Sequence, residues 1–447
     1  MDSGPRGRLA NGLATQSVHP TLRGMAAAAA PIVERLDRLV PGARDFALRF
    51  WDGSEVPPAT GDGAPRLTFV LRSPRALAYI ARRPDQVGFG RAWVSGELDL
   101  EGDLEEALAL RERFDDLGMT RGDRAALLRA ARRLGALPLR APAPPAAEAR
   151  PRGRRHSLAR DRAAVRHHYD VPEAFYRIVL GPSMTYSCAY FSSPEETLEA
   201  AQERKLELVC RKLALRPGQR LLDVGCGWGS LVLHAAGRHG VRAVGVTLSE
   251  PQAAFARERI REAGLADRCE IRVADYREVG DGPYDRIASI GMYEHVGEAQ
   301  LPTYAAHLRG LLTPGGLVLN HGITRLVPRA PGADTFIARY VFPDGELHQL
   351  TAVLRAFEQE GLEVRDVESL REHYPLTLRR WAANLEAQRA AAQEAAGVER
   401  ERVWRLYMPA SARAFERGDI SVYQVLAAAP GTPHGLPLDR TELLRPS

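Results

Sequence analysis

Short apolar runs alternate with helix-like stretches between residues 220 and 320 of this 447-residue chain. Polar or glycine-rich segments bound each run, as expected for strands that are buried on both faces. Strands that alternate with helices form parallel βαβ units. The pattern therefore predicts a doubly wound α/β domain with strands Leu221–Val224, Ala243–Val246, Ile271–Ala274, Ile287–Ile290 and Leu317–Asn320. Beyond them, residues 325–349 follow no regular pattern, and helical periodicity dominates 376–417.

A smaller unit with mixed patterning precedes this domain. Its strand-like runs end at Asp52-Gly53 and Ser73-Pro74, where turns are favoured, and Asp103 is positioned to cap a helix. The predicted elements are strands at 46–51 and 66–71, a helix at 74–82, a strand, turn and strand at 89–100, and a helix at 104–110. We therefore predict a small α+β domain over residues 31–118, without a catalytic cluster of its own.

Composition separates the two predicted domains. Residues 119–160 form a linker, rich in proline at 141–146 and in arginine at 150–155. Low complexity predicts a disordered leader over 1–30, while the larger domain takes up 161–430 and leaves a tail at 431–447. No apolar run approaches the ~20 residues of a membrane span. Four Cys without metal-like or disulfide-rich spacing favour a reducing, cytoplasmic compartment.

The net charge of +5 is unevenly distributed. Residues 111–166 hold fifteen Arg and six acidic residues, a local charge of +9, which leaves the rest of the chain at −4. A basic segment favours an anionic surface, either phospholipid headgroups or nucleic acid. The linker lacks the interleaved aromatic residues that stack on bases, which disfavours nucleic acid. A solvated linker in a chain that prefers Arg to Lys is the alternative.

The strongest chemical signal follows the first predicted strand. That strand carries Asp223 and runs into the glycine-rich turn 225–229, which contains Trp228 and precedes a helical pattern. Glycine lacks a Cβ, so such a turn lets the backbone approach a ligand closely at a helix N-terminus. The turn predicts a site for a nucleotide-like cofactor, with Asp223, Gly225, Cys226, Gly227, Trp228 and Gly229 as its residues.

Polar residues follow the next two strands in the same way. Thr247, Ser249 and Gln252 come after the second strand, where ribose hydroxyls bind in doubly wound folds. A plain helix cap by Ser249 is the alternative interpretation. Asp275 and Tyr276 follow the third strand, where the carboxylate can accept from an adenine amino group and the ring can cover the base. Three such elements in order favour cofactor binding over three unrelated structural roles.

Titratable residues end the fourth and fifth strands. Glu294 and His295 follow the fourth strand and His321 ends the fifth, so they share the sheet edge where ligands bind. Aromatic and polar residues crowd 167–176 and 184–191, which predicts a lid over the cofactor or an aromatic packing layer. Tyr340 adds a hydroxyl from the irregular segment, and the apolar surroundings fit a lipid-like substrate.

Together, these motifs resemble the cyclopropane-fatty-acyl-phospholipid synthase family. The resemblance covers about residues 165–430 and, more weakly, 31–118. It rests on the motifs His168–Asp170, Tyr186–Tyr190, Asp223–Gly229, Gly245–Ser249, Met292–Gly297 and Phe342–Glu346, with Thr377–Trp381 and Val422–Gln424. It implies a class I methyltransferase domain with a Rossmann-like sheet, preceded by a small lipid-associated domain.

The resemblance also implies S-adenosylmethionine as methyl donor and a bound bicarbonate ion as base. The implied cofactor residues add Tyr186 and Ser187 to those of the three strand ends. The implied bicarbonate pocket consists of Cys188, Glu294, His321, Ile323 and Tyr340. An alkene that attacks a sulfonium methyl leaves a carbocation, so a base must remove a proton while water is excluded. No metal is implied.

The implied reaction transfers a methylene carbon to the double bond of an unsaturated phospholipid acyl chain and gives a cyclopropane fatty acid. Two departures from the family pattern bear on this. No Cys follows Gln424, which excludes a covalent thiol there, and Gly322 stands where many cyclopropane synthases have Thr. A methylene-branched fatty acid from the same carbocation is therefore the alternative product. A methyltransferase of RNA or small molecules is the weaker alternative.

The expected partner is a phospholipid bilayer with unsaturated acyl chains. The resemblance and the basic linker predict a cytoplasmic enzyme that is peripheral at the inner face of the membrane, with the N-terminal unit assisting membrane contact. A homodimer is compatible with the same resemblance, and nucleic acid is not an expected partner.

Overall fold

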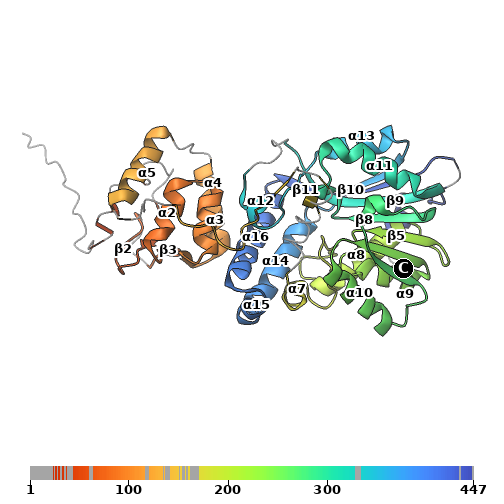
Figure 1. Ribbon diagram of the computed structural model, residues 1–447, viewed down its shortest axis with the longest axis horizontal. Helices are drawn as coiled ribbons and strands as arrows, with labels where there is room; N and C mark the ends of the chain where they lie inside the picture. Colours follow the sequence, from red (N-terminus) through yellow and green to blue (C-terminus); the bar gives the residue numbers. More distant parts are fainter. Residues whose placement is uncertain are drawn as a thin grey trace, which may run out of the picture.

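The computed structural model describes residues 24, 26–27, 29–30, 33–34, 37, 44–59, 64–115, 120–133, 135, 141–150, 152–153, 157, 160–161, 171–327, 334–431 and 434–444. Figure 1 shows a small unit formed by the N-terminal elements and a larger α/β unit, with helices from the C-terminal part of the chain between them. Each unit is built around its own sheet.

The larger unit contains a seven-stranded sheet in the order β10-β11-β9-β8-β5-β6-β7. Pairing is parallel from β9 to β7, whereas β11 is antiparallel to both β9 and β10. The five predicted strands and the doubly wound α/β class are confirmed. β10 and β11 are additional to the predicted set. The strands are β5 (Arg220–Val224), β6 (Arg242–Thr247), β7 (Cys269–Val273), β8 (Tyr284–Ile290), β9 (Leu312–Arg325), β10 (Glu363–Ser369) and β11 (Ile420–Ala428).

Helices cover both faces of this sheet, as Figure 1 shows. One face packs against α8 (Leu198–Lys212), α9 (Ser230–His239) and α10 (Glu250–Glu262), and the other against α11 (Leu301–Gly310) and α13 (Leu350–Gln359). Within β5, Leu221 faces the first group and Leu222 the second. Because successive side chains point to opposite faces, a strand buried on both faces is apolar at most positions, as the sequence pattern shows.

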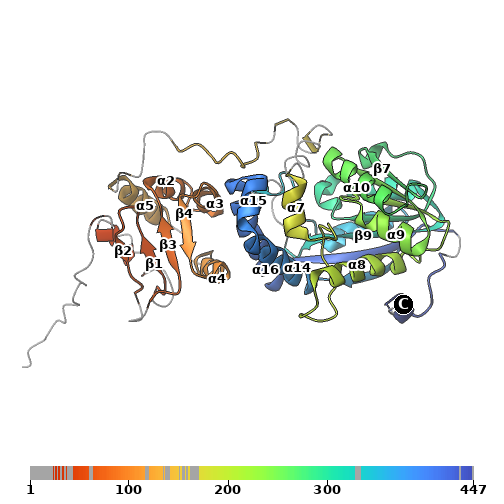
Figure 2. The same cartoon turned by 90° about the horizontal axis from the view of Figure 1, so that it is seen from below.

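The small unit contains a four-stranded sheet in the order β2-β1-β3-β4. Figure 2 shows α2, α3 and α5 on one side of this sheet and α4 on the other, and separate apolar clusters fill the two sides. The predicted helix at 74–82 is confirmed, and Asp103 caps α4 through the N–H groups of Glu105 and Glu106. The elements are β1 (Ala47–Arg49), β2 (Glu55–Val56), β3 (Thr68–Leu71), α2 (Pro74–Arg82), β4 (Leu98–Glu101) and α4 (Leu104–Asp115).

The prediction of a strand, turn and strand over 89–100 is wrong in its first half, which is the helix α3 (Gln86–Val94). The Asp85 side chain caps this helix by accepting from the N–H groups of Val87 and Gly88. Gly90 suggested a turn but serves packing instead, because a Cβ there would lie 2.4 Å from the Phe336 ring. The second half is confirmed as β4.

The predicted leader and linker both contain residues that pack on the small unit. Ala26 and Ala29 are buried against Phe50 and Val56, so this part of the predicted leader belongs to the core of the unit. Within the predicted linker, α5 (Arg121–Arg133) packs on α2. Further along, Glu148 is buried and accepts two hydrogen bonds from Arg91, at 2.8 and 2.7 Å. The domain boundaries at 118, 160 and 430 remain predictions.

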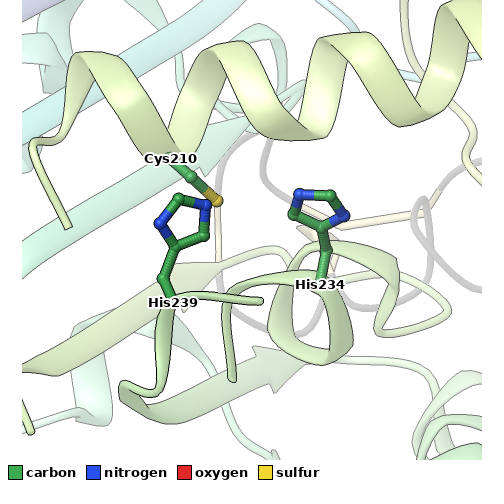
Figure 3. Close-up of side chains that lie close together, drawn as sticks. All are labelled: Cys210, His234 and His239. Atoms are coloured by element: carbon green, nitrogen blue, oxygen red, sulfur yellow. The ribbon is translucent and has the colours of Figure 1, made fainter. Parts of the chain in front are cut away.

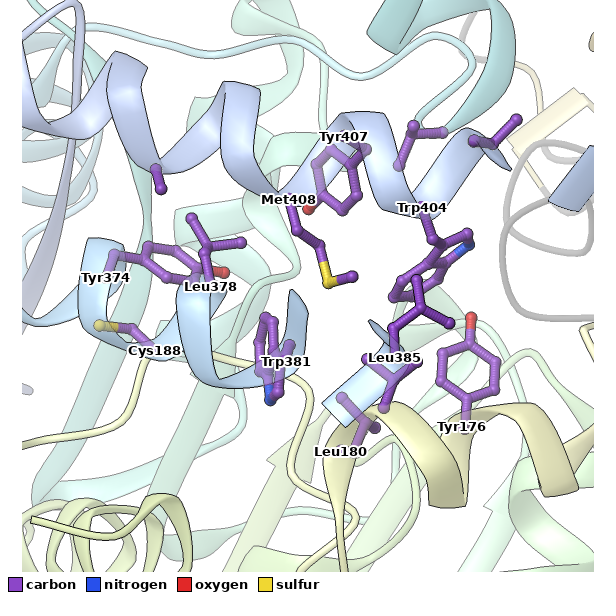
Figure 4. Close-up of a cluster of buried hydrophobic side chains, with 14 of the residues drawn as sticks. Tyr176, Leu180, Cys188, Tyr374, Leu378, Trp381, Leu385, Trp404, Tyr407 and Met408 are labelled. Carbon is purple, nitrogen blue, oxygen red and sulfur yellow. The ribbon is translucent and has the colours of Figure 1, made fainter. Parts of the chain in front are cut away.

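A helical layer lies between the two sheets (Figure 2). Helical structure over 376–417 is confirmed, whereas the predicted irregular segment 325–349 includes one short helix. Figure 4 shows the apolar core of this layer, where Trp381, Trp404 and Met408 pack beside Tyr176. The layer consists of α7 (Glu173–Leu180), α12 (Phe336–Tyr340), α14 (His373–Ala387), α15 (Arg389–Ala396) and α16 (Val398–Glu416).

The small unit is tied to this layer by hydrogen bonds between buried or half-buried groups. The Trp93 indole donates to the Arg402 carbonyl at 2.8 Å, and the Arg402 guanidinium donates to the Trp93 carbonyl at 2.5 Å. Arg379 of α14 adds a bidentate pair with Glu105 of α4, both contacts at 2.8 Å.

Of the helices that the structure describes, none has the length and apolar character needed to cross a membrane.

Candidate functional site

A cavity opens beyond the carboxyl ends of β5, β6, β7 and β8, the edge where doubly wound folds bind ligands. Eleven of the thirteen residues predicted to contact a cofactor line it. They are Tyr186, Ser187, Asp223, Gly225, Cys226, Gly227, Trp228, Thr247, Gln252, Asp275 and Tyr276. The predicted lid residues His167 to Asp170 lie outside the described residues.

The two remaining predicted residues, Gly229 and Ser249, cap helices instead of lining the cavity. Gly229 is the left-handed N-cap of α9, with φ 81°, and a Cβ there would lie 2.8 Å from Cβ of Ala256. Its role is therefore the close packing of α9 on α10. Ser249 is the N-cap of α10 and accepts from the Gln252 N–H, as the alternative interpretation held.

Polar groups from β6 and β7 form one end of the cavity. The Thr247 hydroxyl donates to the Gln252 side chain at 2.8 Å, which orients both toward the space after β6. Asp275 caps a short 3-10 helix, η1 (Tyr276–Glu278), and is held by two hydrogen bonds from Arg277, at 2.7 and 2.8 Å. Burial raises the pKa of Tyr276 to about 12, so its hydroxyl stays protonated.

Lys205 of α8 also lines the cavity, and sequence reasoning missed it. Its Nζ donates to the Ser187 hydroxyl at 3.0 Å, and the side chain is buried. Burial lowers the pKa of Lys205 to about 8, while burial raises the pKa of Asp223 to about 7 against the opposing charge of Lys205. A lysine on an amphipathic helix usually faces solvent. The one sequence feature that could have indicated a buried Lys205 is its position on the helix face that carries the apolar residues of α8.

These groups fit S-adenosylmethionine. Its ammonium and carboxylate have opposite-charge partners in Asp223 and Lys205, and its ribose and adenine have hydrogen-bonding groups in Gln252 and Asp275. The Trp228 indole nitrogen is buried without a hydrogen-bond partner, as expected for a donor that a ligand engages. The cavity thus combines charged groups at one end with base- and ribose-binding groups at the other.

None of the five residues predicted to bind bicarbonate is among the described residues that line this cavity. Glu294 belongs to the short 3-10 helix η2 (Tyr293–His295), whose last residue, His295, does line the cavity. The Ile323 N–H donates to Glu294 Oε1 at 2.8 Å, and Glu294 Oε2 is buried without a partner. Burial raises the pKa of Glu294 to about 7.

His321 and Cys188 are buried close to the charge of Lys205. Gln424 of β11 bonds His321 Nδ1 at 3.3 Å, and burial, with the charges of Lys205 and Lys212, lowers the pKa of His321 to about 3. The imidazole is therefore neutral. The Cys188 thiol donates to the Ala189 carbonyl at 3.3 Å, and burial raises its pKa, so it stays a thiol. Figure 4 shows Cys188 at the border of the aromatic core.

The structure gives Tyr340 a partner that sequence reasoning did not anticipate. Its hydroxyl donates to Glu148 Oε2 at 3.1 Å. The carboxylate of Glu148 is already held by Arg91 and by Arg339, so it is a strong charge-assisted acceptor. Glu294 and Ile323 are thus brought together, whereas the Tyr340 hydroxyl is committed to Glu148. A role of Tyr340 in binding an anion remains a prediction.

This chain departs from the family pattern at Gly322. The nearby Tyr293 ring leaves no room for a side chain at this position. A Cβ at Gly322 would lie 2.2 Å from the Tyr293 ring, whose hydroxyl donates to the Ile323 carbonyl at 3.1 Å. The ring thus occupies the space that a threonine side chain would need. In this structure the position of the Tyr293 ring therefore leaves no space for a side chain at residue 322, close to the contact between Ile323 and Glu294.

We expect Gly322→Ala to destabilise the protein by about 1–3 kcal/mol, because it overpacks a buried contact. Urea unfolding of the parent chain and the variant measures this loss. Tyr293→Ala removes the obstructing ring, so adding it to Gly322→Ala should cost less than the sum of the two single changes. Strict additivity would contradict the coupling.

Comparison with known proteins agrees with this geometry. The family model for mycolic acid cyclopropane synthetase matches residues 156–425. A probable fatty acid methyltransferase of Mycobacterium tuberculosis is 44% identical over 86% of this chain and 91% of its own length. Another, of Pseudomonas putida, is 39% identical over 89% of this chain and 96% of its own length.

Solved structures match part of this chain. The cyclopropane synthase MmaA2 from Mycobacterium tuberculosis has a TM-score of 0.57 at 33% identity and covers 60% of this chain and 98% of its own. The cyclopropane synthase CmaA1, in complex with SAH and CTAB, has the same TM-score at 34% identity and the same coverage. The expected class I methyltransferase fold is thus confirmed. With the family model matching more than half of its residues, the chain belongs to the mycolic acid cyclopropane synthetase family of S-adenosylmethionine-dependent lipid methyltransferases.

Proposed function

We propose that this enzyme transfers a methylene carbon from S-adenosylmethionine to the double bond of an unsaturated acyl chain of a membrane phospholipid and forms a cyclopropane fatty acid. The observation that carries this proposal is the buried, unpartnered carboxyl oxygen of Glu294, next to cavity-lining His295. A methyltransferase acting on N–H or O–H groups can lose the substrate proton to water, whereas an alkene needs a base inside a dry site.

The apolar surroundings of the cavity support an acyl chain as substrate. Trp228 lines the cavity and belongs to the same buried cluster as Trp381 and Trp404, and Tyr186 both lines the cavity and packs against that cluster. One side of the cofactor site is therefore continuous with apolar side chains from α7, α14 and α16. Such surroundings suit a hydrocarbon chain and exclude water from a carbocation.

S-adenosylmethionine, when bound, supplies an electrophilic methyl carbon to the alkene. The aromatic residues then keep water from the resulting cation on the acyl chain. The added carbon then loses a proton, and the electrons of that C–H bond form a bond from the added carbon to the cationic carbon. This bond closes the three-membered ring. Glu294 is suited to take part, because its pKa of about 7 allows it to hold or release a proton near neutral pH.

Bicarbonate as the base remains part of the proposal. Protonated Glu294 can donate to an anion through Oε2, and the buried, neutral ring of His321 offers a further polar group. Ile323 N–H and the Tyr340 hydroxyl have other partners in this structure, so the fit rests on Glu294 and His321. These two residues would hold the ion, which would supply a proton acceptor of its own.

A methylene-branched product is the second candidate, favoured by Gly322 at the position where many cyclopropane synthases have Thr. One relative, 34% identical over 92% of this chain, is named a tuberculostearic acid methyltransferase. A 1,2-hydride shift that moves the cation to the carbon bearing the new methyl group, followed by loss of a proton from that methyl group, gives a methylene branch instead of a ring. The two products therefore differ in whether this hydride shift precedes the loss of the proton.

Incubation of the full-length protein with S-adenosylmethionine and vesicles of monounsaturated phospholipid tests the proposal. We expect acyl chains heavier by one CH₂ that survive mild hydrogenation unchanged, as a cyclopropane does. A product that gains two hydrogens instead identifies the methylene-branched acid. The absence of any one-carbon gain in the lipid, with turnover of RNA or small molecules, would overturn the proposal.

We also propose that the enzyme contacts the bilayer peripherally, supported by the charge of +9 in residues 111–166. The same vesicles, prepared with and without anionic lipid, measure this by co-sedimentation. Binding to anionic vesicles that weakens with added salt is the expected result.

A further inference from the structure

Four side chains with metal-ligating groups meet between α8 and α9, outside the site described above. Atoms of Cys210, His234 and His239 that could ligate a metal all lie within 4.8 Å of one another. Oε2 of Glu207 lies 3.1 Å from Nε2 of His234 and 3.1 Å from Nε2 of His239. Figure 3 shows the Cys210 sulfur beside the His239 ring, with His234 projecting into the same space between the helices.

The helices bring these residues together from two separate segments. Glu207 and Cys210 are three residues apart on α8, so they share one face. His234 lies within α9 and His239 is its last residue, and α9 packs against α8. The spacing of the cysteines in the sequence does not indicate this cluster, because Cys210 is its only cysteine. The other three side chains are Glu207, His234 and His239, and the two histidines are more than 20 residues away from Cys210 in the sequence.

We propose that Glu207, Cys210, His234 and His239 form a structural Zn²⁺ site that joins α8 to α9. One thiolate, two imidazoles and one carboxylate are the ligand types of tetrahedral zinc sites. Ligand atoms around such an ion lie about 3.3–3.6 Å apart, so shifts of about 1 Å would bring the atoms of Cys210, His234 and His239 to this spacing, while Glu207 already contacts both imidazoles. Cys210 is buried and the other three side chains are 10–23% exposed, which gives a small ion a short path inward.

The position suggests what the ion would do. α8 contributes Lys205 and Leu206 to the cofactor cavity, and α9 contributes Ser230 and Leu231. An ion shared by both helices holds these two walls of the cavity in register. Zinc binding should therefore stabilise the fold and couple favourably to cofactor binding, because both ligands select the same packing of α8 on α9.

Metal titration of the full-length protein, without an affinity tag and after chelator treatment, tests the site. We expect one Zn²⁺ per chain, a higher Tm with zinc, and a thiolate-to-metal charge-transfer band with Co²⁺. Cys210→Ser should abolish that band, whereas Cys269→Ser, a matched change in a half-buried thiol of β7, should leave it intact.

His239→Gln provides a second variant, because this residue is at the partly exposed end of α9 and its loss is easily accommodated. We expect a loss of zinc affinity on the order of 100-fold or more, since even indirect support of a ligand is worth 10–100-fold. Substoichiometric zinc, or a Co²⁺ thiolate band that persists in Cys210→Ser, would overturn the proposal and leave the cluster as a hydrogen-bonded contact between helices.

Discussion

Glu294→Gln is expected to lower turnover on phospholipid vesicles by ~10²–10⁴-fold, the usual effect of removing a group that handles a proton. Gln keeps the shape of the side chain, and its carbonyl can still accept from the Ile323 N–H, which lies 2.8 Å from Glu294 Oε1. Only the ionisable function is lost. Binding of S-adenosylhomocysteine, measured by calorimetry, should remain that of the parent chain.

Stability provides an independent readout of the same variant. Burial raises the pKa of Glu294 from 4.5 to about 7, so the folded chain holds this proton more tightly than the unfolded chain does. The contribution of Glu294 to stability is therefore greatest below pH ~4.5 and declines as pH rises toward 7, a difference of about 3 kcal/mol. Glu294→Gln should thus unfold at higher urea concentration than the parent chain at pH 8.

Glu298→Gln is the matched control, because it replaces an exposed carboxylate four residues further along the chain. It should change neither the turnover nor the urea concentration of unfolding at pH 8. Near-parental turnover by Glu294→Gln would assign Glu294 a structural role only. Reduced turnover together with reduced stability at pH 8 would instead indicate that the substitution disturbs the fold around Ile323.

The sequence predicts β5, β6, β8 and β9 well because these strands are buried on both faces and are largely apolar. β10 escapes detection because it is an edge strand in which exposed and half-buried residues alternate through Glu363–Ser369. α3 is misread because its glycines resemble a turn, although Gly90 is small in order to admit the Phe336 ring.

The cofactor site is predictable for the same local reasons, since each motif directly follows its own strand. The surroundings of the predicted bicarbonate residues cannot be predicted in this way, because they depend on contacts between segments that are distant in the sequence. Tyr340 meets Glu148, 192 residues earlier, and His321 meets Gln424, 103 residues later. A single sequence carries the identity of such residues but not their pairing, which only tertiary packing determines.

Lys205→Met is expected to weaken binding of S-adenosylhomocysteine by about 10–100-fold, the range for losing a hydrogen bond to a charged group. Lys205 and Arg277 are the cations among the described residues lining the cavity, and Arg277 is already paired with Asp275. Lys205 donates to a neutral hydroxyl, that of Ser187, so its charge is available to the carboxylate of the cofactor. Met preserves the buried, unbranched shape.

Methylthioadenosine, which lacks the amino-acid part of the cofactor, separates this role from a general effect on folding. The parent chain and Lys205→Met should bind it with equal affinity, because the contact removed by the substitution is one that this ligand cannot make. Arg204→Met, which removes the neighbouring charge on α8 and its pair with Glu196, should bind both ligands like the parent chain. If Lys205→Met weakened the binding of both ligands equally, Lys205 would stabilise the wall of the cavity and would not bind the cofactor carboxylate. The charge of Lys205 would then interact with that of Asp223 instead of with the cofactor.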